Sequence, residues 1–93
     1  MTQAQLQAFT GRYRFGPDFH VRNIGATVAA EKDYLTMHWD AGDRVTTLIP
    51  VGPDRFFDPT YWADMQFVDT PAGKKILYKS FGFAKTYEAV PVS

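Results

Sequence analysis

Short segments that alternate between apolar and polar residues, each ended by a turn signal, constrain the fold of this chain more than any other feature. The run Leu35–Trp39 is typical, because Leu35, Met37 and Trp39 are apolar and the residues between them are polar. A period of two places successive side chains on opposite faces of a strand. Similar segments recur along the chain between Gly-, Pro- and Asp-rich turns, which predicts an all-β domain.

The stretch Leu48–Phe57 illustrates how one strand ends and the next begins. An apolar segment reaches Pro50, and Gly52-Pro53-Asp54 then supplies turn residues. Two adjacent aromatic residues follow, of which Phe56 is the expected core anchor.

The links between these segments are short, so neighbouring strands are expected to pair antiparallel in sequence order. About eight short strands in a meander predict a small up-and-down barrel or half-barrel, which hides strand edges. One of them is expected to run through residues 19–31, with a bulge or bend at Gly25. The last is expected over Phe83–Val90.

The N-terminal segment Thr2–Ala8 is predicted as a short helix. Thr2 is a suitable N-cap, and Leu6 and Phe9 lie three residues apart, so they can share one face and pack down as a lid. The prediction is therefore a single domain over residues 1–93, with a helix or lid in 1–10 and strands in 11–90.

Composition limits both the interior and the partners. Eight Phe, five Tyr and two Trp in 93 residues favour a barrel filled by side chains over a roomy pocket. Ten basic residues balance ten acidic ones without clustering, which argues against nucleic-acid binding. No apolar run is long enough for a transmembrane segment, and no cysteine is present.

Residues suited to catalysis are few. The two serines, Ser80 and Ser93, lie outside any nucleophile motif, so we expect no enzyme and no cofactor. His20 and His38 each stand two residues from an aspartate, and paired strands bearing them could form a metal site. The favoured interpretation is that each histidine lies at the surface or rim beside its carboxylate, with no metal bound.

Loop aromatic residues are the remaining candidates for function. Tyr61 and Trp62 follow Pro59 in a loop, and aromatic side chains are enriched at binding hot spots. They either contact a ligand or partner, or cap one end of the barrel. The candidate contact residues are Trp39, Tyr61, Trp62, Met65 and Phe81.

The order and spacing of several motifs resemble the small lipocalin-like C-terminal domain of β-lactamase-type serine hydrolases and related bacterial peptidases. The motifs are Leu6-x-x-Phe9-x-Gly11-x-Tyr13, Leu48-x-Pro50-x-Gly52-x-Asp54-x-Phe56, Met65-x-Phe67-x-Asp69 and Gly73-Lys74. The resemblance implies a barrel of about eight strands that serves as an accessory module and carries no catalytic residues. The end of this chain is more aromatic than that pattern.

Two functions follow as expectations. The first is a non-catalytic accessory or interaction domain, whose partner is a catalytic hydrolase domain or a second copy. The alternative is a small calycin-like carrier of an apolar small molecule, with a cavity near Trp39, Tyr61, Trp62 and Met65. A fragment of an exported hydrolase would be periplasmic or secreted, and otherwise the domain would be cytoplasmic.

Overall fold

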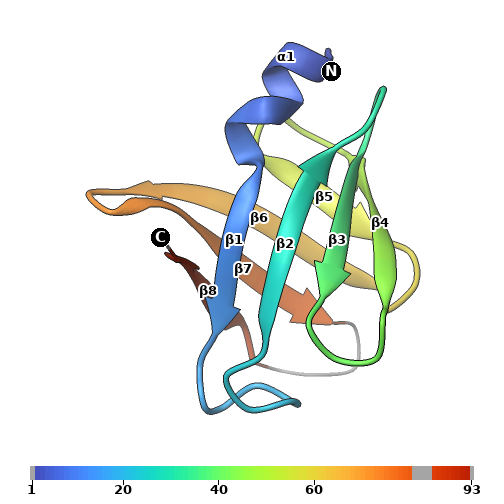
Figure 1. The fold of residues 1–93 in the computed structure, drawn as a ribbon. Coiled ribbons are helices and arrows are strands. Elements are labelled where there is room, and N and C mark those ends of the chain that lie inside the picture. Colours follow the sequence, from blue (N-terminus) through green and yellow to red (C-terminus); the bar gives the residue numbers. More distant parts are fainter. Residues whose placement is uncertain (1, 81–84, 93) are drawn as a thin grey trace.

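A computed structural model of the protein describes residues 2–80 and 85–92 (Figure 1). One turn of α-helix, α1, is continued by a short 3-10 helix, η1, and eight strands follow. Their bounds are α1 Gln3–Leu6, η1 Gln7–Phe9, β1 Gly11–Phe15, β2 Gly25–Ala30, β3 Leu35–Trp39, β4 Val45–Pro50, β5 Arg55–Asp58, β6 Ala63–Thr70, β7 Gly73–Ser80 and β8 Tyr87–Val92.

The eight strands form a closed antiparallel barrel in sequence order. Each strand pairs with the next, and β8 returns to pair with β1, placing Arg12 opposite Val92 and Phe15 opposite Ala89. Closure removes the exposed strand edges that an open meander would leave. The predicted up-and-down barrel is confirmed. No helix in the described residues is long and apolar enough to cross a membrane.

Strand alternation determines which side chains fill the barrel. In β3, for example, Met37 is fully buried between the polar residues Thr36 and His38, of which His38 is exposed. The same period of two operates in the other strands. The inward residues predicted from it are all buried: Tyr13, Phe15, Leu35, Met37, Trp39, Phe56, Met65, Phe67, Ile76 and Tyr78.

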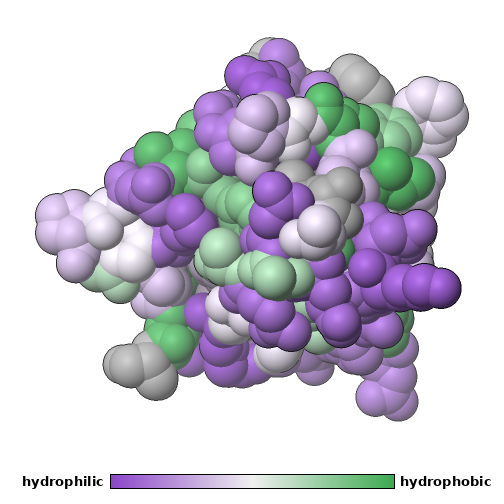
Figure 2. Space-filling model, turned by 90° about the horizontal axis from the view of Figure 1, so that it is seen from above, coloured by the Kyte–Doolittle hydropathy of each residue, from purple (hydrophilic) through white to green (hydrophobic). Residues whose placement is uncertain are grey.

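The helical segment closes one end of the barrel, the upper end in Figure 1. Thr2 caps α1, since its hydroxyl accepts from the Gln5 amide at 3.2 Å and its own amide donates to the Gln5 side chain at 2.8 Å. Leu6 and Phe9 are buried, as predicted. Seen from this end, polar side chains predominate and apolar ones form small separate groups (Figure 2).

An aromatic cluster lies directly under the helical lid. The Phe9 ring is 5.2 Å from Phe56 and 4.9 Å from Phe67, measured between centroids. The Tyr13 hydroxyl donates to the Phe9 carbonyl oxygen at 2.9 Å, which holds the end of η1 over the barrel. This half of the interior is therefore filled with side chains, as the composition predicted.

The prediction of a strand through residues 19–24 is wrong. The segment between Phe15 and Ile24 is the loop of the β1–β2 hairpin, closed by the Phe15 amide donating to the Ile24 carbonyl at 2.9 Å. Asn23 adopts a left-handed backbone with φ of 57°, which turns the chain back. Phe19 and Val21 alternate with polar residues in the sequence, but both lie in this loop, and Val21 is exposed.

Gly25 begins β2, where the sequence had predicted a bulge or bend. A Cβ atom at this position would lie 2.8 Å from the Arg12 guanidinium and closer still to the Asp40 carboxylate. Arg12 and Asp40 form an ion pair across the outer surface of β1, β2 and the end of β3. A larger residue at this position would displace the two charged ends of the ion pair, which lies over the backbone.

Candidate functional site

A cavity of about 350 Å³ lies at the end of the barrel opposite the helix and is partly open to solvent. Its wall combines the β1–β2 loop, the β3–β4 turn, the β5–β6 loop and the end of β7. Most of the lining is apolar or aromatic. The lining residues are Phe19, His20, Val21, Ile24, Trp39, Ala41, Arg44, Tyr61, Tyr78 and Ser80.

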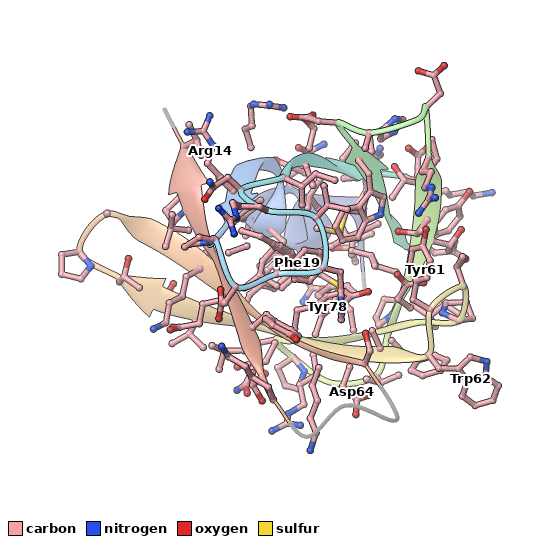
Figure 3. The ribbon with its side chains drawn as sticks, turned by 90° about the horizontal axis from the view of Figure 1, so that it is seen from below. Arg14, Phe19, Tyr61, Trp62, Asp64 and Tyr78 are labelled. Atoms are coloured by element: carbon pink, nitrogen blue, oxygen red, sulfur yellow. The ribbon has the colours of Figure 1, made fainter. Side chains whose placement is uncertain are left out.

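Phe19 reaches from the β1–β2 loop into the mouth of the barrel. Figure 3 looks into this end and shows Phe19 over the barrel interior, beside Tyr78. The Phe19 ring lies 4.1 Å from Phe15 and 5.6 Å from Tyr78, between centroids. An ion pair between Asp18 and Lys85, 2.5 Å long, ties the same loop to the segment before β8.

Three further rings form the wall below Phe19. Trp39 stands nearly perpendicular to both Tyr61 and Tyr78, with centroid distances of 6.2 and 6.0 Å. The Phe19 and Trp39 rings are parallel to within 7° at 6.0 Å. The ring planes around the cavity thus lie in two nearly orthogonal orientations.

A buried carboxyl group lies behind this wall. Asp58, the last residue of β5, has no solvent exposure. Its Oδ1 accepts from the amides of Thr60 and Tyr61 at 2.8 and 3.4 Å, and these bonds shape the loop that carries Tyr61. Its Oδ2 has no partner within good hydrogen-bond geometry, although the Thr46 hydroxyl is near enough to lower the pKa of the carboxyl group. An unsatisfied buried acceptor is costly and rare in folded proteins.

Burial controls the ionisation of this region. Removal from water raises the pKa of Asp58, although the amides of Thr60 and Tyr61 and the Thr46 hydroxyl act in the opposite direction. Burial also raises the pKa of Tyr78 well above its usual value, and the nearby charge of Asp58 adds to that increase. Asp58 is therefore close enough to Tyr78 for its charge to act on this residue of the cavity wall.

Hydrogen bonds fix the polar atoms around the cavity. The Trp39 indole N–H donates to the Thr46 hydroxyl at 3.2 Å, which orients the ring. At the rim, the Arg44 guanidinium donates to the Tyr61 hydroxyl at 2.9 Å. Ser80 is buried and interacts with the Tyr78 hydroxyl. The site therefore combines an apolar body with a few placed polar groups, as small-molecule sites do.

The predicted contact residues do not all meet at this cavity. Trp39 and Tyr61 line it, whereas Met65 is buried in the core and borders a second hollow over β5–β7. Trp62 points away from the barrel and is 62% exposed (Figure 3). Phe81 lies outside the described residues. Tyr61 and Trp62 are neighbours in sequence, but one faces the interior and the other faces solvent.

The two histidines are not brought together. His20 lies on the β1–β2 loop at the cavity rim, 5.1 Å from the Tyr87 ring, whereas His38 is on the outer face of β3. Their aspartates are engaged elsewhere, Asp18 with Lys85 and Asp40 with Arg12. In residues 2–80 and 85–92, no cluster of three or more His, Cys, Asp or Glu side chains could hold a metal ion.

Comparisons with known proteins add no assignment: no family model, curated protein or solved structure matches the chain. The likeness to the C-terminal domain of serine hydrolases stays a prediction from sequence motifs.

Sequence reasoning missed Phe19, Asp58 and Tyr78 as parts of a site. For Asp58 and Tyr78 the signal was present, because alternation places Asp58 on the face of Phe56 and Tyr78 on the face of Ile76. An acidic residue on a core face is unusual and can indicate a buried, hydrogen-bonded carboxyl group. Phe19 had no such signal, because its inward position depends on the loop conformation.

Proposed function

We propose that this domain binds a small, largely apolar molecule in the cavity at the open end of the barrel. The observation that carries the proposal is the cavity itself, whose volume of about 350 Å³ falls within the range of roughly 300–1,000 Å³ found for ligand sites. The opposite end is closed by α1 and η1, so a ligand would enter through one mouth. The proposed activity is binding, without catalysis.

Filling the rim of the cavity should weaken binding. Ala41 lines the mouth on the exposed β3–β4 turn, where a larger side chain can be accommodated without disturbing the core. We expect Ala41→Phe to weaken binding of the fluorescent probe N-phenyl-1-naphthylamine by about tenfold or more, because it occupies ligand space. The measurement is the rise in probe emission on titration with protein.

The matched control for that substitution is Val90→Phe, which adds the same ring to an exposed position on β8 outside the cavity lining. It should bind the probe as the unmodified protein does. The proposal fails if the unmodified protein gives no emission rise, or if both variants bind equally well.

A second candidate function is contact with another protein through the outer surface of β4 and β5. Ile49 and Phe57 are cross-strand partners there, and the Trp62 ring lies 5.8 Å from Phe57, nearly perpendicular to it. Trp62 has φ of 50°, a strained conformation for a bulky residue that costs on the order of 1–3 kcal/mol. This surface suits the accessory role expected from the sequence, with a catalytic domain or a second copy as partner.

Self-association through this surface predicts a concentration-dependent mass in sedimentation equilibrium. Trp62→Ser should shift the protein to monomer, because an exposed aromatic anchor is lost. Val90→Ser, which removes an exposed apolar side chain from β8, should leave association unchanged. A monomeric mass for the unmodified protein at all concentrations would exclude the second copy as partner.

A further inference from the structure

The aromatic wall of the cavity and the acid behind it suggest the chemical class of the ligand. Phe19, Trp39, Tyr61 and Tyr78 line the cavity with their ring planes in two nearly orthogonal orientations and with neighbouring centroids 5.6–6.2 Å apart. The face of an aromatic ring carries negative potential and attracts cations, and groups of such faces recognise ammonium ions. Aromatic faces alone would also accept a neutral molecule.

Asp58 favours a cationic ligand over a neutral one. The side chain is fully buried, its Oδ2 has no partner within good hydrogen-bond geometry, and its Oδ1 is held by the Tyr61 amide. When ionised, Asp58 places negative charge close to the two tyrosines. In surroundings of low dielectric constant, that charge acts strongly on an ion bound in front of them.

A positive group lies at the rim of the cavity. The Arg44 guanidinium donates a hydrogen bond to the Tyr61 hydroxyl, which is the outer end of that side chain, and Arg44 itself is exposed. The charge therefore changes sign along the cavity, from positive at the mouth to negative behind the aromatic wall.

We propose that the ligand is an organic ammonium compound: a methylated amine or similar cationic group on an apolar body, bound with the cationic group against the faces of Trp39, Tyr61 and Tyr78. This inference rests on the proposed function, because it requires a ligand in the same cavity. It adds a preference for positive charge over a neutral molecule of the same shape. Arg44 at the rim opposes entry of the cation and makes the preference smaller than it would otherwise be.

The test compares two probes of nearly identical shape, (4-hydroxyphenyl)trimethylammonium and 4-tert-butylphenol, which differ by one positive charge. Binding is followed by NMR through the indole N–H of Trp39, and the exposed Trp62 indole serves as an internal control. We expect the cation to bind about tenfold more tightly than the neutral probe. Only the Trp39 signal should shift at saturation.

Three variants test the physical origin of that preference. Asp58→Asn keeps an oxygen for the Thr60 and Tyr61 amides, and it should reduce the ratio of the two affinities to near one without changing the affinity for the neutral probe. Arg44→Gln should increase the ratio. Tyr61→Leu removes one aromatic face at a half-buried position and should decrease it, so the test holds even if the Asp58 variant does not fold.

The outcomes separate the two proposals. Equal affinities, or tighter binding of the neutral probe, would overturn the ammonium class and leave a general apolar site. A preference for the cation that persists in both Asp58→Asn and Tyr61→Leu would also overturn it. If neither probe shifts the Trp39 signal, the proposed binding function falls together with the ligand class.

Discussion

Replacing Phe56 with alanine is expected to lower the free energy of unfolding by about 3–5 kcal/mol. The ring is fully buried and packs edge-on against Phe9 at 5.2 Å and Phe67 at 5.5 Å, so its removal leaves a cavity beneath the helical lid. Domains of this size are stable by only about 5–15 kcal/mol. The variant should therefore unfold at much lower urea concentration, as followed by circular dichroism.

The neighbouring strand provides the control for this substitution. Ile49 lies on β4 beside the Pro50–Phe56 pair, but its side chain faces outward and is 44% exposed. Ile49→Ala should change stability by about 0.5 kcal/mol or less, as surface substitutions usually do. Comparable losses in the two variants would contradict the assignment of Phe56 to the core and Ile49 to the surface.

Asp58 should make the protein less stable as pH rises from about its ordinary pKa of 3.8 through its raised pKa in the folded state. Burial raises its pKa in the folded state above the ordinary value of 3.8, so the folded protein retains a proton that the unfolded chain has released. Unfolding then releases a proton, and stability falls as pH rises from about the ordinary value through the raised pKa. The slope within that window reaches at most about 1.4 kcal/mol per pH unit.

Asp58→Asn removes this titration, so its stability should not show that decline, and above the window the variant should be more stable than the unmodified protein. The free energy of urea unfolding is measured against pH for both proteins, and the difference between the two curves gives the contribution of Asp58 alone. Asp40 and Asp18, whose pKa values are lowered by Arg12 and Lys85, remain in both proteins. Those two exposed pairs affect stability at lower pH and in the opposite direction.

Asp64→Asn is the matched control, because Asp64 is an exposed carboxylate on β6 opposite Phe57. This variant should still show the decline in stability with pH, because Asp58 is unchanged in it. Parallel profiles for the unmodified protein and Asp58→Asn would show that the buried carboxyl group does not titrate differently in the folded and unfolded states.

Local sequence patterns were sufficient to predict most of the barrel. The period of two in β3, β6 and β7 identified inward residues such as Met37, Phe67 and Ile76, all of which are buried. The Gly52-Pro53-Asp54 turn joins β4 to β5 as expected, with the Val51 amide donating to the Arg55 carbonyl. These features follow from backbone geometry within a few residues, so they can be read from the chain.

The expected filled interior is found only in the half of the barrel under the helix. At the other end the side chains leave a cavity, which Trp39 and Tyr61 line and Trp62 and Met65 do not. Side-chain volumes cannot be assigned to one end of a barrel from composition alone. The distribution depends on strand register and on the loops that cover each end.

The different orientations of Tyr61 and Trp62 could not be predicted from the sequence either. The sequence offered both as ligand contacts or caps, and the loop between β5 and β6 sends one inward and one outward. That outcome depends on the bonds from the Thr60 and Tyr61 amides to Asp58 and on the left-handed conformation of Trp62. Neither is visible in an alternation pattern.

The all-β class, the antiparallel order, the inward faces of most strands and the capped N-terminal helix could be predicted from the chain, because each depends on interactions between near neighbours. The pairing of β8 with β1 and the position of Phe19 over the open end became known from the tertiary structure. The same is true of the position of Asp58 close to Tyr61 and Tyr78. Contacts between residues far apart in sequence decide these features: β8 pairs with β1, Phe19 packs on Tyr78, and the pairing of β6 with β5 and β7 brings Asp58 near Tyr78.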